Sequence, residues 1–562
     1  MATEWGADGA GDFNVADVHE AIAARQPDRE CIVFGERRLS WGDVDERTRR
    51  LASFLHDRGL GCHTERAALA PWQSGQDHLA IYLHNGNEYL ESLLGAFKAR
   101  VAPFNVNYRY QAGELRELLD DASARAAVYH SAFAPTLSAA IANRSGLDVL
   151  VQVPDGSGQP LLPGATWYED ALAAGHPAGP NVARSPDDLY ILYTGGTTGL
   201  PKGVLWRQGD AFTECFGGAR VGAVGTVDDV VAAATSRVSA VVAPPFMHGA
   251  GQWMSFLTWH TGGCVLVPPR PERFDPEDVL GLGERERASF LMIVGDAFAR
   301  PLIGELDRRS YDLSCLTTVM SGGASLSVAS KTALLERLPH VLIVDGIGAS
   351  EAGGQGRLVS GGGSTPRSGH FLLTRGSVVL SADLTGVLPG DDHSLGWLAK
   401  TGRLPLGYLG HAGKTSVTFP EVDGRRYAVA GDRARMGADG HVELQGRDSV
   451  TINSGGEKIF AEEVEAALMA CPDVADCVVA GRPEDRWGNE VVAVVALRAG
   501  ATTDAAELLE WAERSLARYK RPRAIVFVPE VVRSPSGKPD YRWAAAVARS
   551  APASASIPSP GR

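Results

Sequence analysis

The sequence predicts an α/β protein, with a large N-terminal body of several α/β layers followed by a small, mobile α+β domain. Short apolar runs recur along the chain, among them 190–193, 264–267, 290–294 and 341–344, and amphipathic or loop stretches separate them. Buried strands joined by crossover helices produce this pattern. After residue 447 the chain changes to closely spaced short helical and strand-like runs, which indicates a compact second unit.

The first elements follow from local signals. Residues 31–34 and 37–39 flank the turn Gly35-Glu36 and predict a hairpin. A helix is expected at 41–58, because Ser40 stands before it as a cap and Gly59 follows it as a terminating residue. A strand at 79–83 and a helix at 87–98 continue the alternation.

The C-terminal unit carries similar signals. We expect a helix at 462–469, strands at 491–497 and 525–528, and a further helix from 504 to 517. Asp504 can cap the last of these helices, since Glu507 stands three residues further on, as in a capping box.

Three parts are expected along the 562 residues, a length that exceeds one compact core. They are an N-terminal domain at 1–447, a C-terminal domain at 448–548 and a tail at 549–562. The tail is rich in Pro, Ser and Ala, which predicts disorder.

Composition excludes several classes of protein. The chain has 54 Lys and Arg against 67 Asp and Glu, a net charge of −13, which argues against a nucleic-acid footprint. Seven widely spaced cysteines without a CxxC motif argue against a disulfide framework or a zinc site. The first residues lack a basic and an apolar region of a signal peptide, and no apolar run is long enough to span a bilayer. We therefore expect a cytoplasmic protein without a transmembrane segment.

The strongest motif is Tyr193-Thr-Gly-Gly-Thr-Thr-Gly-Leu-Pro-Lys-Gly203, which follows the strand-like run 189–192. Its glycines and threonines offer backbone N–H groups and hydroxyls to a polyphosphate, and Lys202 adds a positive charge. It is not a Walker A loop, because Pro201 precedes the lysine and Gly203 follows it.

This loop resembles the phosphate loop of the adenylate-forming superfamily, which includes acyl-CoA synthetases, luciferases and peptide-synthetase adenylation domains. The superfamily's other motifs follow in the expected order, at 347–351, 430–432, 446–448, 454–459 and 533–542. Details such as Ser-Glu-Ala-Gly-Gly-Gln-Gly and Arg-Ser-Pro-Ser-Gly-Lys-Pro-Asp-Tyr-Arg-Trp are similar to actinobacterial fatty-acyl and steroid-side-chain CoA ligases.

The resemblance implies roles for residues at the nucleotide. Lys538 and Thr198 would be catalytic, and Glu351 would be catalytic and hold Mg²⁺. Other residues would contact ATP or the ribose: Thr194, Gly195, Gly196, Thr197, Lys202, Gly323, Ala324, Gly346, Ile347, Ser350, Asp432 and Arg447.

The resemblance also implies roles in acid binding and in the second half-reaction. His248, Gly249, Trp253 and Gly322 would border the acyl group. Asp448 would be the hinge about which the C-terminal domain turns, and that turn would bring Gly455 and Gly456 to the site.

The expected function is that of an AMP-forming acyl-CoA ligase with ATP, Mg²⁺ and coenzyme A. A hydrophobic carboxylate would attack the α-phosphate of ATP to give acyl-AMP and pyrophosphate, and the thiol of CoA would then displace AMP. The acid could be a fatty acid, a steroid side chain, another polycyclic acid or an aryl acid. The resemblance also implies a homodimer.

Three alternatives stay open. The enzyme could be an acyl-AMP ligase that loads a carrier protein. Departures from the family pattern at Ile347, Ala430 and 410–414 raise the hypothesis of a weakened nucleotide site and an enzyme that favours the thioester half-reaction. A nucleotide-binding regulatory relative is the non-enzymatic alternative, and one observation argues against it: four residues occur together, Glu351, Asp432, Arg447 and Lys538. A stretch at 62–77 looks like an insertion.

Overall fold

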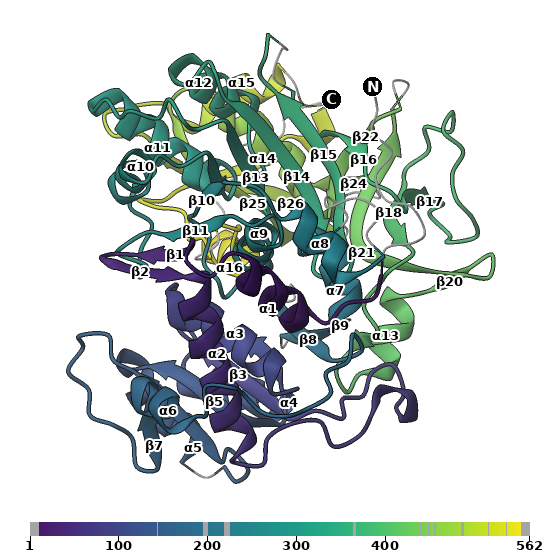
Figure 1. Ribbon diagram of the computed structural model, residues 1–562. Helices are drawn as coiled ribbons and strands as arrows, with labels where there is room; N and C mark the ends of the chain where they lie inside the picture. Colours follow the sequence, from purple (N-terminus) through teal and green to yellow (C-terminus); the bar gives the residue numbers. More distant parts are fainter. Residues whose placement is uncertain are drawn as a thin grey trace.

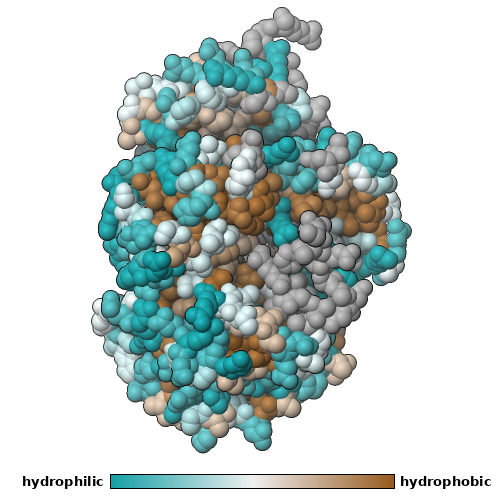
Figure 2. Space-filling view, turned by 45° about the horizontal axis from the view of Figure 1, so that its top comes forward, coloured by the Kyte–Doolittle hydropathy of each residue, from teal (hydrophilic) through white to brown (hydrophobic). Residues whose placement is uncertain are grey.

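The computed structural model describes residues 11–142, 144–194, 201–218, 225–363, 367–437, 440–447, 450–454, 457–484, 488–514, 516, 518–534 and 537–551. Two large sheets form the N-terminal body, and the C-terminal elements pack beside the larger of them (Figure 1). Figure 2 shows apolar residues gathered across the middle of one face, with hydrophilic surface above and below them.

The larger sheet has 14 strands among the described residues, and one half of it is parallel. Apolar runs predicted from the sequence form this half, with the antiparallel β2 (Arg37–Ser40) at its edge. Its parallel strands, in spatial order, are β1 (Glu30–Phe34), β11 (Cys264–Val267), β10 (Ser239–Val242), β12 (Phe290–Ile293), β13 (Thr318–Gly322) and β14 (Leu342–Ala349).

The other half of this sheet is antiparallel and continues from β14. Its strands are β15 (Gly353–Ser360), β16 (His370–Leu373), β22 (Val442–Arg447), β21 (Arg425–Met436), β18 (Gly396–Thr401) and β17 (Ser377–Leu380), with β20 (Glu421–Val422) paired to β21. The tight turn between β14 and β15 therefore carries Ser350 and Glu351. Pairing of β21 with β22 sets Asp432 opposite Arg447.

The smaller sheet has eight strands among the described residues. In spatial order they are β19 (Gly407–Tyr408), β9 (Lys202–Arg207), β8 (Leu189–Thr194), β4 (Ala102–Asn105), β3 (His78–Tyr82), β5 (Ala124–His130), β6 (Val149–Val153) and β7 (Ala165–Trp167). The predicted phosphate loop connects β8 to β9, which pair antiparallel from Leu189 with Arg207 to Thr194 with Lys202.

Helices cover the sheets and join them. The helices of the body are α1 (Val15–Arg25), α2 (Trp41–His56), α3 (Asn87–Lys98), α4 (Ala112–Asp121), α5 (Ala134–Ile141), α6 (Tyr168–Ala174), α7 (Gln208–Glu214), α8 (Val227–Ala233), α9 (Gly249–His260), α10 (Pro276–Arg285), α11 (Gly295–Arg308), α12 (Val328–Arg337) and α13 (Ala412–Thr418). Helices α1, α2, α3 and α9 contribute to one apolar core that includes residues of both sheets, such as Tyr190 and Val265. This shared core fixes the two sheets relative to each other.

The C-terminal elements have cores of their own. They comprise the hairpin β23 (Thr451–Ser454) and β24 (Glu457–Phe460), the sheet β25 (Val474–Glu484), β26 (Gly488–Leu497) and β27 (Ala524–Phe527), and helices α14 (Ala461–Met469), α15 (Ala505–Glu513) and α16 (Tyr541–Ser550). One apolar cluster joins the sheet to α14 and α15, and a second joins it to α16.

Most predicted elements are confirmed, with shifts at their ends. Helix α2 begins with a capping box formed by Ser40 and Asp43, and α15 begins with one formed by Asp504 and Glu507. The strand predicted at 341–344 extends to Ala349, because the antiparallel partner β15 pairs along its whole second half. Helix α15 ends at Glu513, earlier than predicted.

The domain limits stay predictions, since Asp448 and residues 552–562 lie outside the described residues. Helix α16 continues to Ser550, so it includes the first two residues of the tail that was expected to be disordered. All seven cysteines are free. Among the described helices, none combines the length and the apolar character that crossing a bilayer requires.

Candidate active site

A cavity of about 2860 Å³ lies at the carboxyl ends of the parallel strands, between the two large sheets and the C-terminal elements. It exceeds the several hundred Å³ typical of a site for one small molecule, so it has room for more than one ligand. Fourteen residues predicted for the site line it: Thr194, Lys202, His248, Gly249, Trp253, Gly322, Gly323, Ala324, Gly346, Ile347, Ser350, Glu351, Asp432 and Lys538.

The remaining predicted site residues are not tested by this geometry. Gly195, Gly196, Thr197, Thr198, Asp448, Gly455 and Gly456 lie outside the described residues. Arg447 ends β22, where its backbone pairs with that of Asp432. The roles given to these residues therefore stay predictions.

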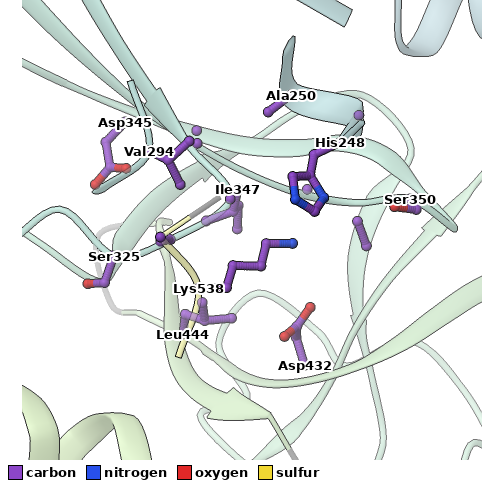
Figure 3. Close-up of a pocket in the computed structure, with 18 of the residues that line it drawn as sticks. His248, Ala250, Val294, Ser325, Asp345, Ile347, Ser350, Asp432, Leu444 and Lys538 are labelled. Carbon is purple, nitrogen blue, oxygen red and sulfur yellow. The ribbon is translucent and has the colours of Figure 1, made fainter. Parts of the chain in front are cut away.

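Lys538 extends from the C-terminal unit into the cavity. Figure 3 shows its side chain between Ile347 and Asp432, with the amine directed toward His248. A Cβ atom added at Gly323 would lie 3.7 Å from Cε of Lys538, and Gly323 has a φ of +88°. A glycine is favoured there because the backbone is in the left-handed region, and the lysine lies at an ordinary van der Waals distance from it.

Arg533 holds the turn that presents Lys538. Its guanidinium makes two 2.6 Å hydrogen bonds to the carboxylate of Asp476 and donates to the carbonyl of Gly537 at 3.0 Å. The backbone N–H of Ser534 donates to the carbonyl of Lys538 at 2.9 Å and closes the turn. A two-pronged guanidinium–carboxylate pair fixes direction as well as distance, so Arg533 sets the orientation of the turn.

Contacts from the N-terminal body hold the C-terminal unit in this position. Arg300 on α11 donates to the backbone carbonyl of Ala475 at 2.8 Å, near the start of β25. The same side chain also reaches the carbonyl of Val474 at 3.4 Å. Asp476, the partner of Arg533, is the next residue, so the docking contact and the Lys538 turn share one short segment.

Glu351 lies beside a tyrosine that the sequence analysis did not assign to the site. The hydroxyl of Tyr408 donates to Oε1 of Glu351 at 2.8 Å, and Nζ of Lys202 lies 5.1 Å from the centre of the Tyr408 ring. Burial, and next the negative charge of Glu351, raise the pKa of the Tyr408 hydroxyl, so it stays protonated and donates. No sequence signal pointed to this contact, since the partners are 57 positions apart in the chain.

The residues present fit Mg²⁺ bound together with a nucleotide. Among the described residues, no group of three or more His, Cys, Asp or Glu side chains could hold a metal ion. Mg²⁺ in nucleotide-binding enzymes usually takes one or two carboxylates, and phosphate oxygens and water complete its coordination. The single carboxylate of Glu351, which lines the cavity with Lys202, matches that donor set.

His248 begins the segment that borders the apolar side of the cavity. Burial, and next the positive charges of Lys538 and Arg109, lower its pKa to about 3, so the imidazole is neutral at physiological pH. Its Nε2 has no hydrogen-bond partner in the part of the chain that the structure describes. Trp253, Met254 and Leu257 follow on α9, and they line the same cavity. This wall suits a hydrocarbon chain.

Two departures from the family pattern lie against each other. The backbone N–H of Gly410 donates to the carbonyl of Trp72 at 2.8 Å, which joins the 410–414 stretch to the insertion at 62–77. His411 lies 3.2 Å from one carboxylate oxygen of Asp121, and Tyr193 donates to the other at 2.7 Å. The 410–414 stretch is thus linked through Asp121 to Tyr193 at the end of β8, and the insertion is linked to the 410–414 stretch.

Comparisons with known proteins agree with this geometry. The profile of the AMP-binding enzyme family matches residues 19–380, and the profile of the AMP-binding enzyme C-terminal domain matches residues 463–538. The chain is 52% identical to the medium-chain acyl-CoA ligase Mig of Mycobacterium avium, over 95% of this chain and 98% of that protein. It is 39% identical to a medium/long-chain-fatty-acid and 3-oxocholest-4-en-26-oate CoA ligase of Mycobacterium marinum, over 95% and 96% of the two chains.

Solved structures share the fold at lower identity. The anthranilate CoA ligase AuaEII in complex with anthranoyl-AMP superimposes with a TM-score of 0.80 at 21% identity, over 95% of this chain and 97% of that chain. A Mycobacterium tuberculosis fatty acyl CoA synthetase gives a TM-score of 0.67 at 21% identity, over 95% and 98% of the two chains. At this level of identity the likeness concerns the architecture.

Proposed function

The chain belongs to the AMP-binding enzyme family, and from this membership we propose that it is an AMP-forming acyl-CoA ligase for a hydrophobic carboxylic acid. One observation carries the proposal: Lys538, Glu351 and Lys202 line the same cavity as the apolar wall around Trp253. This arrangement combines charge for two reacting anions with a surface for a hydrocarbon chain.

In the first half-reaction the protein aligns two anions that repel each other. The ammonium group of Lys538 lies between the substrate carboxylate and the α-phosphate and offsets the charge on both. Lys202 and Thr194 hold the outer phosphates. Mg²⁺, when bound, neutralises further charge on the phosphate oxygens. Glu351 offers it a carboxylate, and Tyr408 keeps that carboxylate in one orientation.

In the second half-reaction CoA needs access to the carbonyl of the acyl-AMP. We propose that the C-terminal domain turns about Asp448, which withdraws Lys538 and brings Gly455 and Gly456 to the site. The contact of Arg300 with Ala475 is then broken. The hydrogen bonds of the Arg300 guanidinium to Val474 and Ala475 contribute on the order of 1 to 3 kcal/mol each, so this docking contact is compatible with an equilibrium between two positions.

The substrate that fits best is a medium-chain fatty acid or a steroid side-chain acid. The names of the two relatives described above give acids of these kinds as their substrates. Trp253, Met254 and Leu257 supply the apolar contact that such acids need. Cytoplasmic location and homodimeric assembly belong to the same proposal, and size-exclusion chromatography with light scattering tests the latter.

A panel of carboxylic acids tests the function. The purified protein is incubated with ATP, Mg²⁺ and CoA, and the mass of each thioester product is measured. We expect acyl-CoA and AMP from medium-chain acids, and none from Lys538→Ala unless acyl-AMP is supplied. Equal loss of both half-reactions in Lys538→Ala would show that Lys538 has another role.

The acceptor separates this proposal from the main enzymatic alternative. The same assay is repeated with a phosphopantetheinylated carrier protein in place of CoA. Faster transfer to the carrier protein than to CoA would favour an acyl-AMP ligase. Failure to exchange pyrophosphate into ATP, and to form a thioester with either acceptor, would favour a non-enzymatic nucleotide-binding protein.

A further inference from the structure

A buried tryptophan binds the main chain of the turn that carries Glu351. Trp206 lies on β9, is fully buried, and is not among the residues that line the cavity. Its ring N–H donates a hydrogen bond of 2.8 Å to the backbone carbonyl of Ser350. Ser350 and Glu351 belong to the turn between β14 and β15, so this bond joins the smaller sheet to the larger one.

The turn is fixed in the core on both sides of Glu351. Ala349 and Ala352 are buried in the same apolar core as Trp206, whereas Ser350 and Glu351 line the cavity. The backbone N–H of Ala352 donates to the carbonyl of Ala349 at 3.0 Å and closes the turn. Trp206 therefore holds the main chain of the turn from the core and leaves the two polar side chains to the cavity.

The strand that carries Trp206 also carries Lys202. Both residues belong to β9, and Lys202 lines the cavity. Tyr408 on β19, the strand beside β9, donates to the carboxylate of Glu351 at 2.8 Å. Two adjacent strands of one sheet thus hold the turn at two points, the carbonyl of Ser350 and the carboxylate of Glu351. This arrangement sets the distance between the proposed phosphate lysine and the proposed Mg²⁺ carboxylate.

The chemistry of the indole ring makes this support directional. Its N–H can donate but cannot accept, and close packing of the core holds the ring in one orientation. Without this donor, the carbonyl of Ser350 faces an apolar core without its partner, which is unfavourable. We therefore expect the turn to shift when the N–H is removed.

We propose that Trp206 is a positioning residue for the first half-reaction, which holds Ser350 and Glu351 at a fixed distance from Lys202. This inference rests on the proposed ligase function and assigns to it a residue behind the cavity wall. ATP and Mg²⁺ then meet a site whose parts are already in place, so little binding energy is spent on arranging them.

Trp206→Phe tests this role, because it deletes the ring N–H and keeps an aromatic residue in the core. We expect kcat/KM for ATP in acyl-AMP formation to fall about tenfold, the effect of one good hydrogen bond. The Mg²⁺ concentration that gives the half-maximal rate should rise. Thioester formation from supplied acyl-AMP should be unchanged, since it does not require ATP.

Trp259→Phe is the matched control. Trp259 is fully buried in the same core, and its ring N–H donates to the carbonyl of Cys31 at 3.2 Å. Neither of these two residues lines the cavity. This variant should lose a comparable amount of stability in urea and keep the wild-type response to ATP and Mg²⁺. Equal kinetic changes in the two variants would show that Trp206 only supports the core.

A second readout does not depend on activity. Calorimetry measures ATP binding in the absence of an acid, with and without Mg²⁺. Mg²⁺ should tighten ATP binding by the wild type and by Trp259→Phe more than it does for Trp206→Phe. If Trp206→Phe does not fold, residue 206 is replaced by the tryptophan analogue in which sulfur takes the place of the ring N–H. This analogue keeps the shape of the ring without the donor, so it should show the same loss.

The outcomes separate this inference from the ligase proposal. If the protein without the N–H at residue 206 forms acyl-AMP at the wild-type rate, with an unchanged effect of Mg²⁺, the role of Trp206 is wrong and the ligase function stands. If the wild type forms neither acyl-AMP nor a CoA thioester from any acid, the ligase proposal is wrong and the inference about Trp206 falls with it.

Discussion

The hydroxyl of Tyr408 donates a 2.8 Å hydrogen bond to the carboxylate of Glu351, while the face of its ring lies 5.1 Å from the ammonium group of Lys202. One side chain thus touches the residue proposed for Mg²⁺ and the residue proposed for the outer phosphates. Tyr408 is placed by strand pairing, because β19 sets it opposite Val204, two residues after Lys202. Its position follows from the same sheet that carries the phosphate loop.

Tyr408→Phe should slow acyl-AMP formation about tenfold or more, since it deletes a hydrogen bond to a charged group and keeps the ring. Formation of the thioester from supplied acyl-AMP should be unchanged. Pyrophosphate release at several Mg²⁺ concentrations measures the first step, and calorimetry of ATP binding with and without Mg²⁺ measures the ion's contribution. Tyr129→Phe, which removes the hydroxyl of a buried tyrosine on β5, is the control. An unaltered response to Mg²⁺ would contradict a positioning role for Tyr408.

Arg533→Lys should impair the same half-reaction by a different route. Lysine cannot reproduce the paired hydrogen bonds to Asp476 and the bond to Gly537, so the turn that presents Lys538 loses its fixed orientation. Small misplacements of a reacting group can cost up to about a hundredfold in rate. Single-turnover measurement of acyl-AMP is the readout.

A double-mutant cycle makes the prediction for Arg533 specific. Asp476→Asn should cause a similar loss, and the double variant should lose little more than either single variant, because both remove one interaction. Additive losses would mean that Arg533 and Asp476 act separately.

The motifs predicted the residues that enter the cavity far better than the residues that hold them. Lys538, Glu351 and Asp432 stand in short local patterns, and all three line the cavity. Tyr408 and Arg300 were missed because their importance depends on partners distant in sequence. Local patterns carry no information on which strands become neighbours.

The same contrast holds for the fold. Capping boxes at Ser40 and Asp504 follow from residues three positions apart, and both helix starts were predicted from the sequence. The pairing of β16 with β22 joins residues about 70 positions apart in the chain, and only long-range packing decides it. The extension of β14 to Ala349 depends on its partner β15 for the same reason.

The burial of His260 predicts that the folded protein loses stability in acid. Its side chain is buried among Phe212, Phe216 and Phe256, and burial lowers its pKa from the ordinary 6.5 to about 4. The unfolded chain then binds a proton that the native protein does not, so stability is complete above pH 6.5 and falls as the pH drops toward 4. The slope is at most about 1.4 kcal/mol per pH unit.

Urea unfolding of His260→Phe and of the wild type at several pH values tests this expectation. The variant should lose less stability than the wild type between neutral and mildly acidic pH, whatever its stability at neutral pH. His176→Phe, at an exposed position, is the control and should keep the wild-type slope. Parallel curves for wild type and His260→Phe would show that His260 does not carry the acid sensitivity.

Ile347→Tyr tests whether the nucleotide half-site is weakened in this chain. Ile347 lies on β14 beside Lys538 in the cavity, and it is one of the residues at which the sequence departs from the family pattern (Figure 3). Aromatic contact with a flat base is worth up to about 1.5 kcal/mol beyond the area it buries, so KM for ATP should fall by up to about tenfold. Thioester formation from supplied acyl-AMP should not change, since it does not require ATP. Ala430→Thr, which introduces a hydroxyl two residues before Asp432, should act in the same direction and add to the first effect. If wild-type acyl-AMP formation is already as fast as the thioester step, the nucleotide site is not weakened, and the aliphatic residue at 347 is simply an alternative contact for the base.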